Sequence, residues 1–275
     1  TAGTTSQYWR GDKTFQTLDA DAVAETSTRS FFRTVAAAGT FGGTINGPVN
    51  CLGNATLTAN TVINGDLYIN GNLNTAGFTL EVKGDAWGSG NVISTPSSDI
   101  AVGWITVRGD MRVGSLDLRP FATATTNVNA GSFTCGGNFY CSASSGQILG
   151  TPILAGTGST IDIGGDAFFA SVSNATIIDV SGQAQTTVNG GAGGSVLIGG
   201  GLFSEVSAPV VTAAGGSTSL ASGTGGAGGT IWINGDAVKG DYVVSGSLTT
   251  AGGAASGTTS TGGLGGNIRV DGDCF

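Results

Sequence analysis

The sequence predicts an all-β protein, a parallel β-helix (β-solenoid) of about eight coils, from three observations. A short phrase, apolar–x–Gly–Asp, occurs eight times with small variations. Apolar residues alternate with other residues around it, and stretches rich in Gly, Ser, Thr and Ala separate the later copies. The shared glycines are Gly65, Gly84, Gly109, Gly137, Gly165, Gly200, Gly235 and Gly272. Their spacing grows from 19 to 37 residues along the chain, and repeats of this size are typical of stacked architectures.

The residues before each shared glycine predict a half-buried strand. The positions four and two residues before it are mostly apolar, as at Leu80 and Val82, while the residue between them varies. Such alternation is the period-two pattern of a strand with one buried face. Gly and Asp then favour a tight corner, because both tolerate left-handed backbone conformations. Two residues after the glycine the side chain is mostly apolar again, as at Leu67 and Phe139.

The later copies indicate a third strand and a loop in each coil. Apolar runs at 176–180, 209–212 and 242–244 lie between successive copies, and tracts of small residues at 215–229 and 252–266 follow two of them. We therefore expect three strands per coil and one loop of small residues. Parallel stacking would repeat these strands at about 4.8 Å per rung.

The composition excludes several classes of partner. The chain of 275 residues carries 10 basic and 18 acidic residues, a net charge of −8. Nucleic acid and anionic membranes are therefore unsuitable partners, since both need a basic surface. No apolar run approaches 18 residues, so the sequence predicts no membrane insertion. The chain opens at Thr1 without Met, which suggests a processed product or a fragment.

The first residues lie outside the repeat. Gln7–Leu18 reads Q-Y-W-R-G-D-K-T-F-Q-T-L and places Tyr8, Trp9 and Phe15 close together. Such a short stretch cannot bury three aromatic rings alone, so we expect an attachment or oligomerisation role for them. Residues 20–33 are expected to form a short helix that caps the stack.

The Gln7–Leu18 segment resembles one found in bacteriophage tail-fibre and related tail proteins. The resemblance covers about 14 residues, and Phe15 stands where the family usually has Trp. It implies a segment between a virion-attachment part and a receptor-binding part, a homotrimer, and a location in the virion. It further implies contacts with other virion tail or capsid proteins.

We divide the chain into residues 1–34, an attachment or oligomerisation segment, residues 35–60, a transition and capping coil, and residues 61–275, the β-helix. Residues 50–57 are expected to form a degenerate first coil, because terminal repeats are often atypical.

The cysteines and the corner aspartates each allow more than one interpretation. All four cysteines fall in expected core positions and are interpreted as small buried hydrophobes, with a Cys135–Cys141 disulfide as the alternative. No His is present to complete a zinc site. The corner aspartates are explained by local side-chain bonds to the backbone two residues on, with bound calcium as the alternative. The corner residues are Asp66, Asp85, Asp110, Asn138, Asp166, Gly201, Asp236 and Asp273.

The carboxylates do not predict an enzyme. The candidates outside the corners are Glu81, Asp99, Asp117, Asp162, Asp179 and Glu205. Glu81 and Asp162 share one outward position, but three coils separate them, roughly 14 Å at one rung each. That distance is too large for a catalytic pair, and without His no Ser–His–Asp triad can form. We predict no catalytic residue, no metal and no cofactor.

The sequence therefore predicts a non-enzymatic structural virion protein, a tail fibre or tail-tip adhesin that binds a host surface glycan or protein. Trp87, Trp104 and Trp232 could stack on sugar rings if exposed, although Trp104 is as readily a core residue. The alternatives are a capsid-decorating or shaft protein without receptor binding, a tailspike polysaccharide hydrolase, and a bacterial surface β-solenoid. The Gly-Gly-x-Gly-Gly strand starts of the last coils resemble such surface proteins, and the Gln7–Leu18 segment argues against them.

Overall fold

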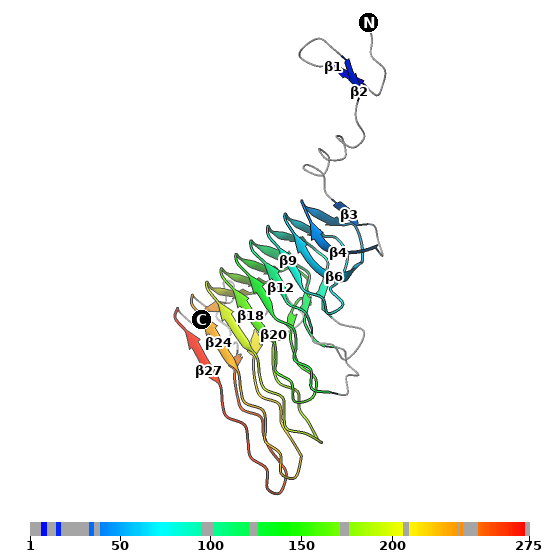
Figure 1. Cartoon of the computed structure of the whole chain (residues 1–275). Helices are drawn as coiled ribbons and strands as arrows, with labels where there is room; N and C mark the ends of the chain where they lie inside the picture. The colour runs from blue at the N-terminus through cyan, green and yellow to red at the C-terminus, as the bar shows by residue number, and fades with distance from the viewer. Residues whose placement is uncertain are drawn as a thin grey trace.

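The fold is a stack of short parallel strands, seen in a computed structural model of the chain (Figure 1). The structure describes residues 7–9, 15–17, 33–35, 39–94, 102–120, 126–170, 176–205, 209–235, 237–238 and 247–272. These residues form strands and loops and contain no helix. From residue 33 onward the strands are parallel and build a nearly closed solenoid, which confirms the predicted all-β class and parallel stacking.

The solenoid has three faces, defined by their position relative to the Gly–Asp corner. Face 1 contains the strands before the corner and face 2 the strands after it. The strands of face 1 are β4 (Gly39–Ile45), β6 (Ala55–Ile63), β9 (Leu80–Val82), β12 (Ile105–Val107), β15 (Phe133–Cys135), β18 (Thr160–Ile163), β21 (Ser195–Ile198), β24 (Thr230–Ile233) and β27 (Asn267–Val270). The strands of face 2 are β3 (Arg33–Val35), β5 (Val49–Cys51), β7 (Leu67–Ile69), β10 (Ala86–Gly88), β13 (Met111–Val113), β16 (Phe139–Cys141), β19 (Ala167–Phe169), β22 (Leu202–Ser204) and β25 (Ala237–Val238).

Face 3 follows a second corner. Its strands are β8 (Leu73–Asn74), β11 (Val92–Ile93), β14 (Leu116–Asp117), β17 (Ile148–Leu149), β20 (Thr176–Asp179), β23 (Val210–Thr212) and β26 (Ser247–Thr249). The long strand β6 pairs with β8 through Ala55 and Thr56 and with β9 through Thr61–Ile63, so faces 1 and 3 form one continuous sheet. Three strands per coil are what the sequence predicts.

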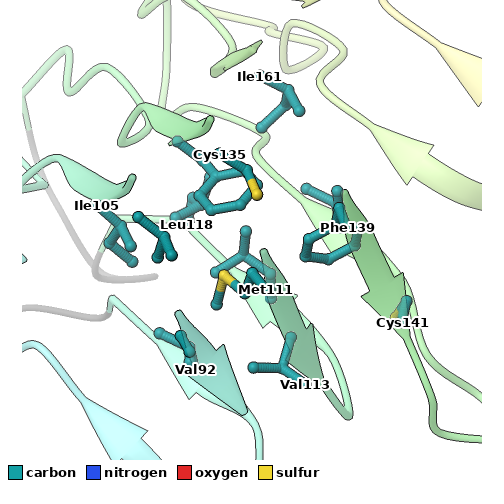
Figure 2. Packing of buried hydrophobic residues seen from close by; sticks show 14 of the residues in the cluster. Val92, Ile105, Met111, Val113, Leu118, Cys135, Phe139, Cys141 and Ile161 are labelled. Carbon is teal, nitrogen blue, oxygen red and sulfur yellow. The ribbon is translucent and has the colours of Figure 1, made fainter. Parts of the chain in front are cut away.

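The inner side chains of all three faces fill one continuous core. The alternating pattern places Ile105 and Val107 of face 1 inside, with Met111 and Val113 of face 2 opposite them. Figure 2 shows Ile105, Met111 and Val113 converging on the same interior space. The Phe139 ring packs edge-on against Phe133, with ring centroids 5.4 Å apart. The core therefore rests on the periodicity visible in the sequence.

The Gly–Asp corner is held by a ladder of hydrogen bonds between neighbouring coils. The backbone N–H of Asp110 donates to Oδ1 of Asp85 at 2.9 Å, and the N–H of Asn138 donates to Oδ1 of Asp110 at 2.7 Å. The same bond joins the other described corner residues from Asp66 to Gly201. Each carboxylate also lies over the next coil's glycine, since a Cβ at Gly137 would be 2.1 Å from Oδ1 of Asp110. The packing of neighbouring coils therefore requires both residues of this corner, the Gly for its small size and the Asp for its side-chain acceptor.

This ladder corrects the prediction that corner aspartates bond to the backbone two residues further on. The bonded residues are separated by 19, 25, 28, 28 and 35 positions along the chain. Asn138 can replace Asp because the bond needs only a side-chain oxygen acceptor. Asp236 and Asp273 lie outside the described residues.

The expected degenerate first coil at residues 50–57 is also wrong. Ile45 pairs with Ile63, and Val49 pairs with Leu67, so Gly47–Pro48 is an earlier copy of the Gly–Asp corner. Gly53–Asn54 instead begins the second corner, where the N–H of Asn72 donates to Oδ1 of Asn54 at 3.0 Å. The chain thus follows the regular coil plan already at β4.

The later coils extend into long loops whose limbs lie against one another (Figure 1). Within a coil, the N–H of Gly229 donates to the carbonyl of Ala213 at 2.7 Å, and between coils the N–H of Gly193 donates to the carbonyl of Ala227 at 2.9 Å. A Cβ at Gly226 would lie 1.8 Å from the carbonyl oxygen of Gly191. Glycine is required there because backbone packs directly on backbone.

The described third strand of the last coil is β26 (Ser247–Thr249). The expected strand at 242–244 lies outside the described residues, and the strand that pairs with β23 is β26, with Val211 opposite Leu248.

The N-terminal segment contains a short antiparallel pair, β1 (Gln7–Trp9) and β2 (Phe15–Thr17), in which Trp9 is opposite Phe15. The expected helix at 20–33 falls mostly outside the described residues, and its last residue, Arg33, begins β3. The division at residues 34 and 60 stays a prediction. Within the described ranges, no helix is long and apolar enough to cross a membrane.

Candidate binding surface

Face 2 carries a column of aromatic side chains on its outer surface. The register of its strands places one outward residue of each coil beside the next. In order along the rod, the described side chains of this column are those of Asn50, Tyr68, Trp87, Arg112, Tyr140, Phe168 and Phe203. Five of these seven side chains are aromatic in a chain with 7% aromatic residues, so the column is a local enrichment. We call it the aromatic column.

The rings in the middle of the column are stacked. Tyr140 and Phe168 have centroids 4.8 Å apart and planes 4° from parallel, and Phe168 and Phe203 have centroids 4.9 Å apart at 13°. These distances match the rung spacing of a sheet, so the stack follows from the backbone register. Both faces of the Phe168 ring are covered by its neighbours. A ligand at this stack therefore meets ring edges, which carry partial positive charge.

A groove lies along this stack, with a volume of about 540 Å³. Tyr140, Phe168 and Phe203 line it on the side of the aromatic column, and Arg112 and Glu205 are charged residues of its lining. The size falls within the range of ordinary ligand sites. The groove is open to solvent along the rod, so it suits an extended ligand.

Trp87 and Trp232, two of the tryptophans predicted to bind sugar, lie on different faces. Trp87 belongs to the aromatic column, where its strand neighbours are Tyr68 and Arg112. Trp232 lies in the outward column of face 1 and is 37% exposed. The structure therefore does not bring them into one site.

Trp232 is already engaged within the chain. The Arg269 guanidinium lies 4.8 Å from its ring centroid, and its Nε1–H donates to Oδ2 of Asp271 at 3.1 Å. These contacts cover one ring face and hold the indole in place. The Arg269 and Trp232 hydrogen bonds lower the pKa of the Asp271 carboxyl. Trp104 is 67% exposed, so its interpretation as a core residue is wrong and the sugar-stacking alternative stays a prediction.

Two of the carboxylates considered as catalytic candidates, Glu81 and Asp117, are paired with cations. Glu81 accepts hydrogen bonds from Lys83 at 2.6 Å and Arg108 at 2.8 Å, and these contacts lower its pKa. Asp117 pairs with Arg119 at 2.6 Å. The register from Glu81 through two threonines to Asp162 confirms that three coil steps separate these two carboxylates. Asp99 lies outside the described residues.

The described cysteines are buried free thiols. Cys51, Cys135 and Cys141 lie in the core, so the alternative of a Cys135–Cys141 disulfide is wrong. Burial raises the pKa of Cys51 to about 11 and of Cys135 and Cys141 to about 12. They are therefore protonated at neutral pH and poor metal ligands. Across the described residues, no three His, Cys, Asp or Glu side chains gather as a metal site. Cys274 lies outside those residues.

The side chains of Tyr8, Trp9 and Phe15 also lie outside the described part, so their attachment role stays a prediction. No family model, curated protein or solved structure matched the chain in the comparisons.

Sequence reasoning missed Arg112, Tyr140, Phe168 and Phe203 as surface residues. The signal was present three residues after each shared glycine, where the copies carry one large side chain after another. The apolar position expected after each corner lies one residue earlier, two residues after the glycine. Successive side chains of a strand point to opposite sides, so the residue next to a core position lies on the outer surface. Parallel stacking of the coils then brings these outward residues into one column.

Proposed function

We propose that the chain is a non-enzymatic structural protein of a bacteriophage particle, a tail fibre or tail-tip adhesin that binds a host surface glycan or protein through face 2. The observation that carries the binding role is the aromatic column with its groove. The outward columns of the other faces are mostly polar, aliphatic or charged, as in the series from Glu81 to Asp162. Half-buried aromatic residues gathered on one face are typical of binding surfaces.

The phage assignment rests on the resemblance of the Gln7–Leu18 segment to tail-fibre proteins. Under this proposal Tyr8, Trp9 and Phe15 contact other virion proteins or sister subunits, and the assembled form is a homotrimer. The body forms about eight coils that lengthen from about 19 to about 37 residues. The spacing of the hydrogen-bonded corner residues supports this lengthening.

The non-enzymatic part of the proposal is supported by the pairing of the acidic side chains. A retaining or inverting glycosidase needs two carboxyl groups within about 5–10 Å of each other across an open site. Glu81 and Asp117 each pair with a cation, and Asp179 accepts a hydrogen bond from the N–H of Ser181 at 3.0 Å. A tailspike hydrolase is tested by incubating the chain with host polysaccharide and measuring reducing ends.

A capsid-decorating or shaft protein is the main alternative, and the corner ladder favours it as much as it favours an adhesin. A bacterial surface β-solenoid would share the fold but would leave the Gln7–Leu18 segment unexplained. Labelling of cells by the isolated chain separates an adhesin from a decorating or shaft protein.

The experiment is to add fluorescently labelled chain to a panel of bacterial strains and to measure its native mass. We expect saturable labelling of some strains and a mass three times that of one 26.9 kDa chain. Absence of labelling on every strain would contradict the adhesin, and a monomeric mass would contradict the trimer.

A further inference from the structure

One cation on the described surface has no acidic partner. Lys83, Arg108, Arg119 and Arg269 each lie within 2.8 Å of a carboxylate oxygen. Arg112 is exposed and forms no ion pair within the described part of the chain. Among the described cationic side chains, Arg112 is therefore the one whose charge is not engaged by a carboxylate of the chain.

The position of Arg112 links it to the groove. It occupies the aromatic column between Trp87 and Tyr140, and it is part of the lining of the groove along the stacked rings. Its guanidinium offers donors in a planar fork that fits a carboxylate in two parallel hydrogen bonds. A bound carboxylate there would have an aromatic side chain on the coil before and on the coil after it.

The stacked rings favour an oxygen-rich ligand. Because Phe168 is covered on both faces, the stack presents edges, whose partial positive charge attracts hydroxyl and carboxylate oxygens. The rungs repeat at about 4.8 Å, close to the repeat of pyranose rings in an extended glycan. Successive sugar units could therefore meet successive rings along the groove.

The charges at the groove give the ligand a direction. Arg112 is on β13, while exposed Glu205 follows β22, three coil steps along face 2. Glu205 can accept hydrogen bonds from sugar hydroxyls and repels a second acidic group. A chain with one acidic unit next to neutral units fits better than a polyanion.

From these features we propose that the face 2 groove binds an extended host-surface glycan with an acidic sugar at Arg112 and neutral sugars toward Glu205. This inference rests on the proposed adhesin function, and it adds the chemical class of the ligand and the residues that select it. Tyr140, Phe168 and Phe203 form the apolar side of the site.

The test uses the full chain on an array of oligosaccharides printed as matched pairs, each acidic glycan beside its neutral counterpart, such as sialylated and desialylated forms. We expect binding to some acidic glycans and at least about tenfold weaker binding to their neutral partners, which is the effect of about 1.4 kcal/mol. Arg112→Gln should weaken binding to the best acidic glycan by a similar factor. Arg108→Gln is the matched control, because it removes the same charge from the Glu81 pair near face 1 and should change affinity by less than about twofold.

The failures of the two proposals are distinguishable. The acidic-glycan site would be overturned by an array that shows no glycan binding or no preference for acidic glycans, or by equal effects of the two arginine variants. If the chain still labels cells in these cases, the adhesin proposal is retained. A wild-type oligomer that Phe168→Ser converts to a monomer would also overturn it, since the groove would then be an interface between copies. If the wild-type chain labels no cells, the adhesin proposal itself is contradicted.

Discussion

Faces 1 and 2 of the rod share one interior plan and differ on their outer surfaces. On both faces, inner positions such as Val107 and Met111 are buried almost completely. On the outside, face 1 changes from Glu81 to Thr106 over one coil, whereas face 2 stacks Tyr140 directly on Phe168. The comparison indicates that inner rows and corners maintain the fold, while the outer rows are free to differ. Function is therefore best sought where an outer row departs from the others.

The largest expected effect comes from emptying an inner position of face 2. Phe139→Ala removes a fully buried ring and its contacts with Phe133 and Phe169, at 5.4 and 5.8 Å between centroids. We expect the free energy of unfolding to fall by about 3–5 kcal/mol. Chemical denaturation measures this loss. The outward variant Phe168→Ala should cost only about 1 kcal/mol per lost ring pair, and similar losses for both would remove the distinction between inner and outer rows.

A smaller loss of stability is expected from a substitution at the Gly–Asp corner, which joins faces 1 and 2. Gly137→Ala would place a Cβ 2.1 Å from Oδ1 of Asp110, so a rung of the ladder must shift. We expect destabilisation of about 2–3 kcal/mol in thermal or denaturant unfolding. Gly265→Ala is the control, because nothing lies within 4 Å of its Cβ position. Equal stability of the two variants would show that the corner tolerates side chains.

The hydrogen bond of the ladder should contribute less to the free energy of unfolding than the close packing at the corner glycine. Asp110→Ala removes the acceptor of the 2.7 Å bond from the Asn138 N–H, and we expect a loss of about 1–2 kcal/mol. Asp110→Asn keeps an oxygen acceptor, as Asn138 itself does for Asp166 at 2.9 Å, and should stay close to wild type. If Asn were as damaging as Ala, the negative charge would be essential to the corner.

The outer row of face 1 should show the smallest effect. Hydrogen bonds from Lys83 and Arg108 lower the pKa of Glu81, so its contribution to stability is present above the unfolded-state pKa of about 4.3 and is lost as pH falls through the folded pKa. Glu81→Gln should therefore be slightly less stable at pH 7 and equal to wild type at pH 2. Thermal unfolding at both pH values tests this. A large difference at pH 7 would mean that outer ion pairs maintain the fold.

The sequence was sufficient for the inner rows and the first corner, because burial imposes a period of two that Leu80 and Val82 display directly. The sequence was insufficient where the same structural position is filled by different residue types, or where one residue type occurs at different structural positions. Pro48 hid an earlier copy of the corner, since it occupies the Asp position without being Asp. Asn54 was assigned to a first coil, although it belongs to a second corner that repeats at Asn72.

The candidate site was only partly predictable. Trp87 was found because tryptophan is conspicuous, but its column appears only once strand register brings distant residues such as Tyr140 and Phe203 onto one line. The significance of Arg112 depends on the absence of an ionic partner in the described structure, which sequence alone does not reveal. The carboxylate ladder was likewise attributed to local bonds, because contacts 19 to 35 residues apart cannot be seen without the coil lengths.

The most direct test of the account compares cell-surface binding by Phe168→Ser and Leu197→Ser. Both replace a half-buried outward residue, one in the aromatic column of face 2 and one in the outer row of face 1. The account predicts that Phe168→Ser loses most of its binding to a strain that the wild type labels, while Leu197→Ser keeps it and both remain folded. Equal binding by the two variants, or greater loss for Leu197→Ser, would contradict the assignment of function to face 2.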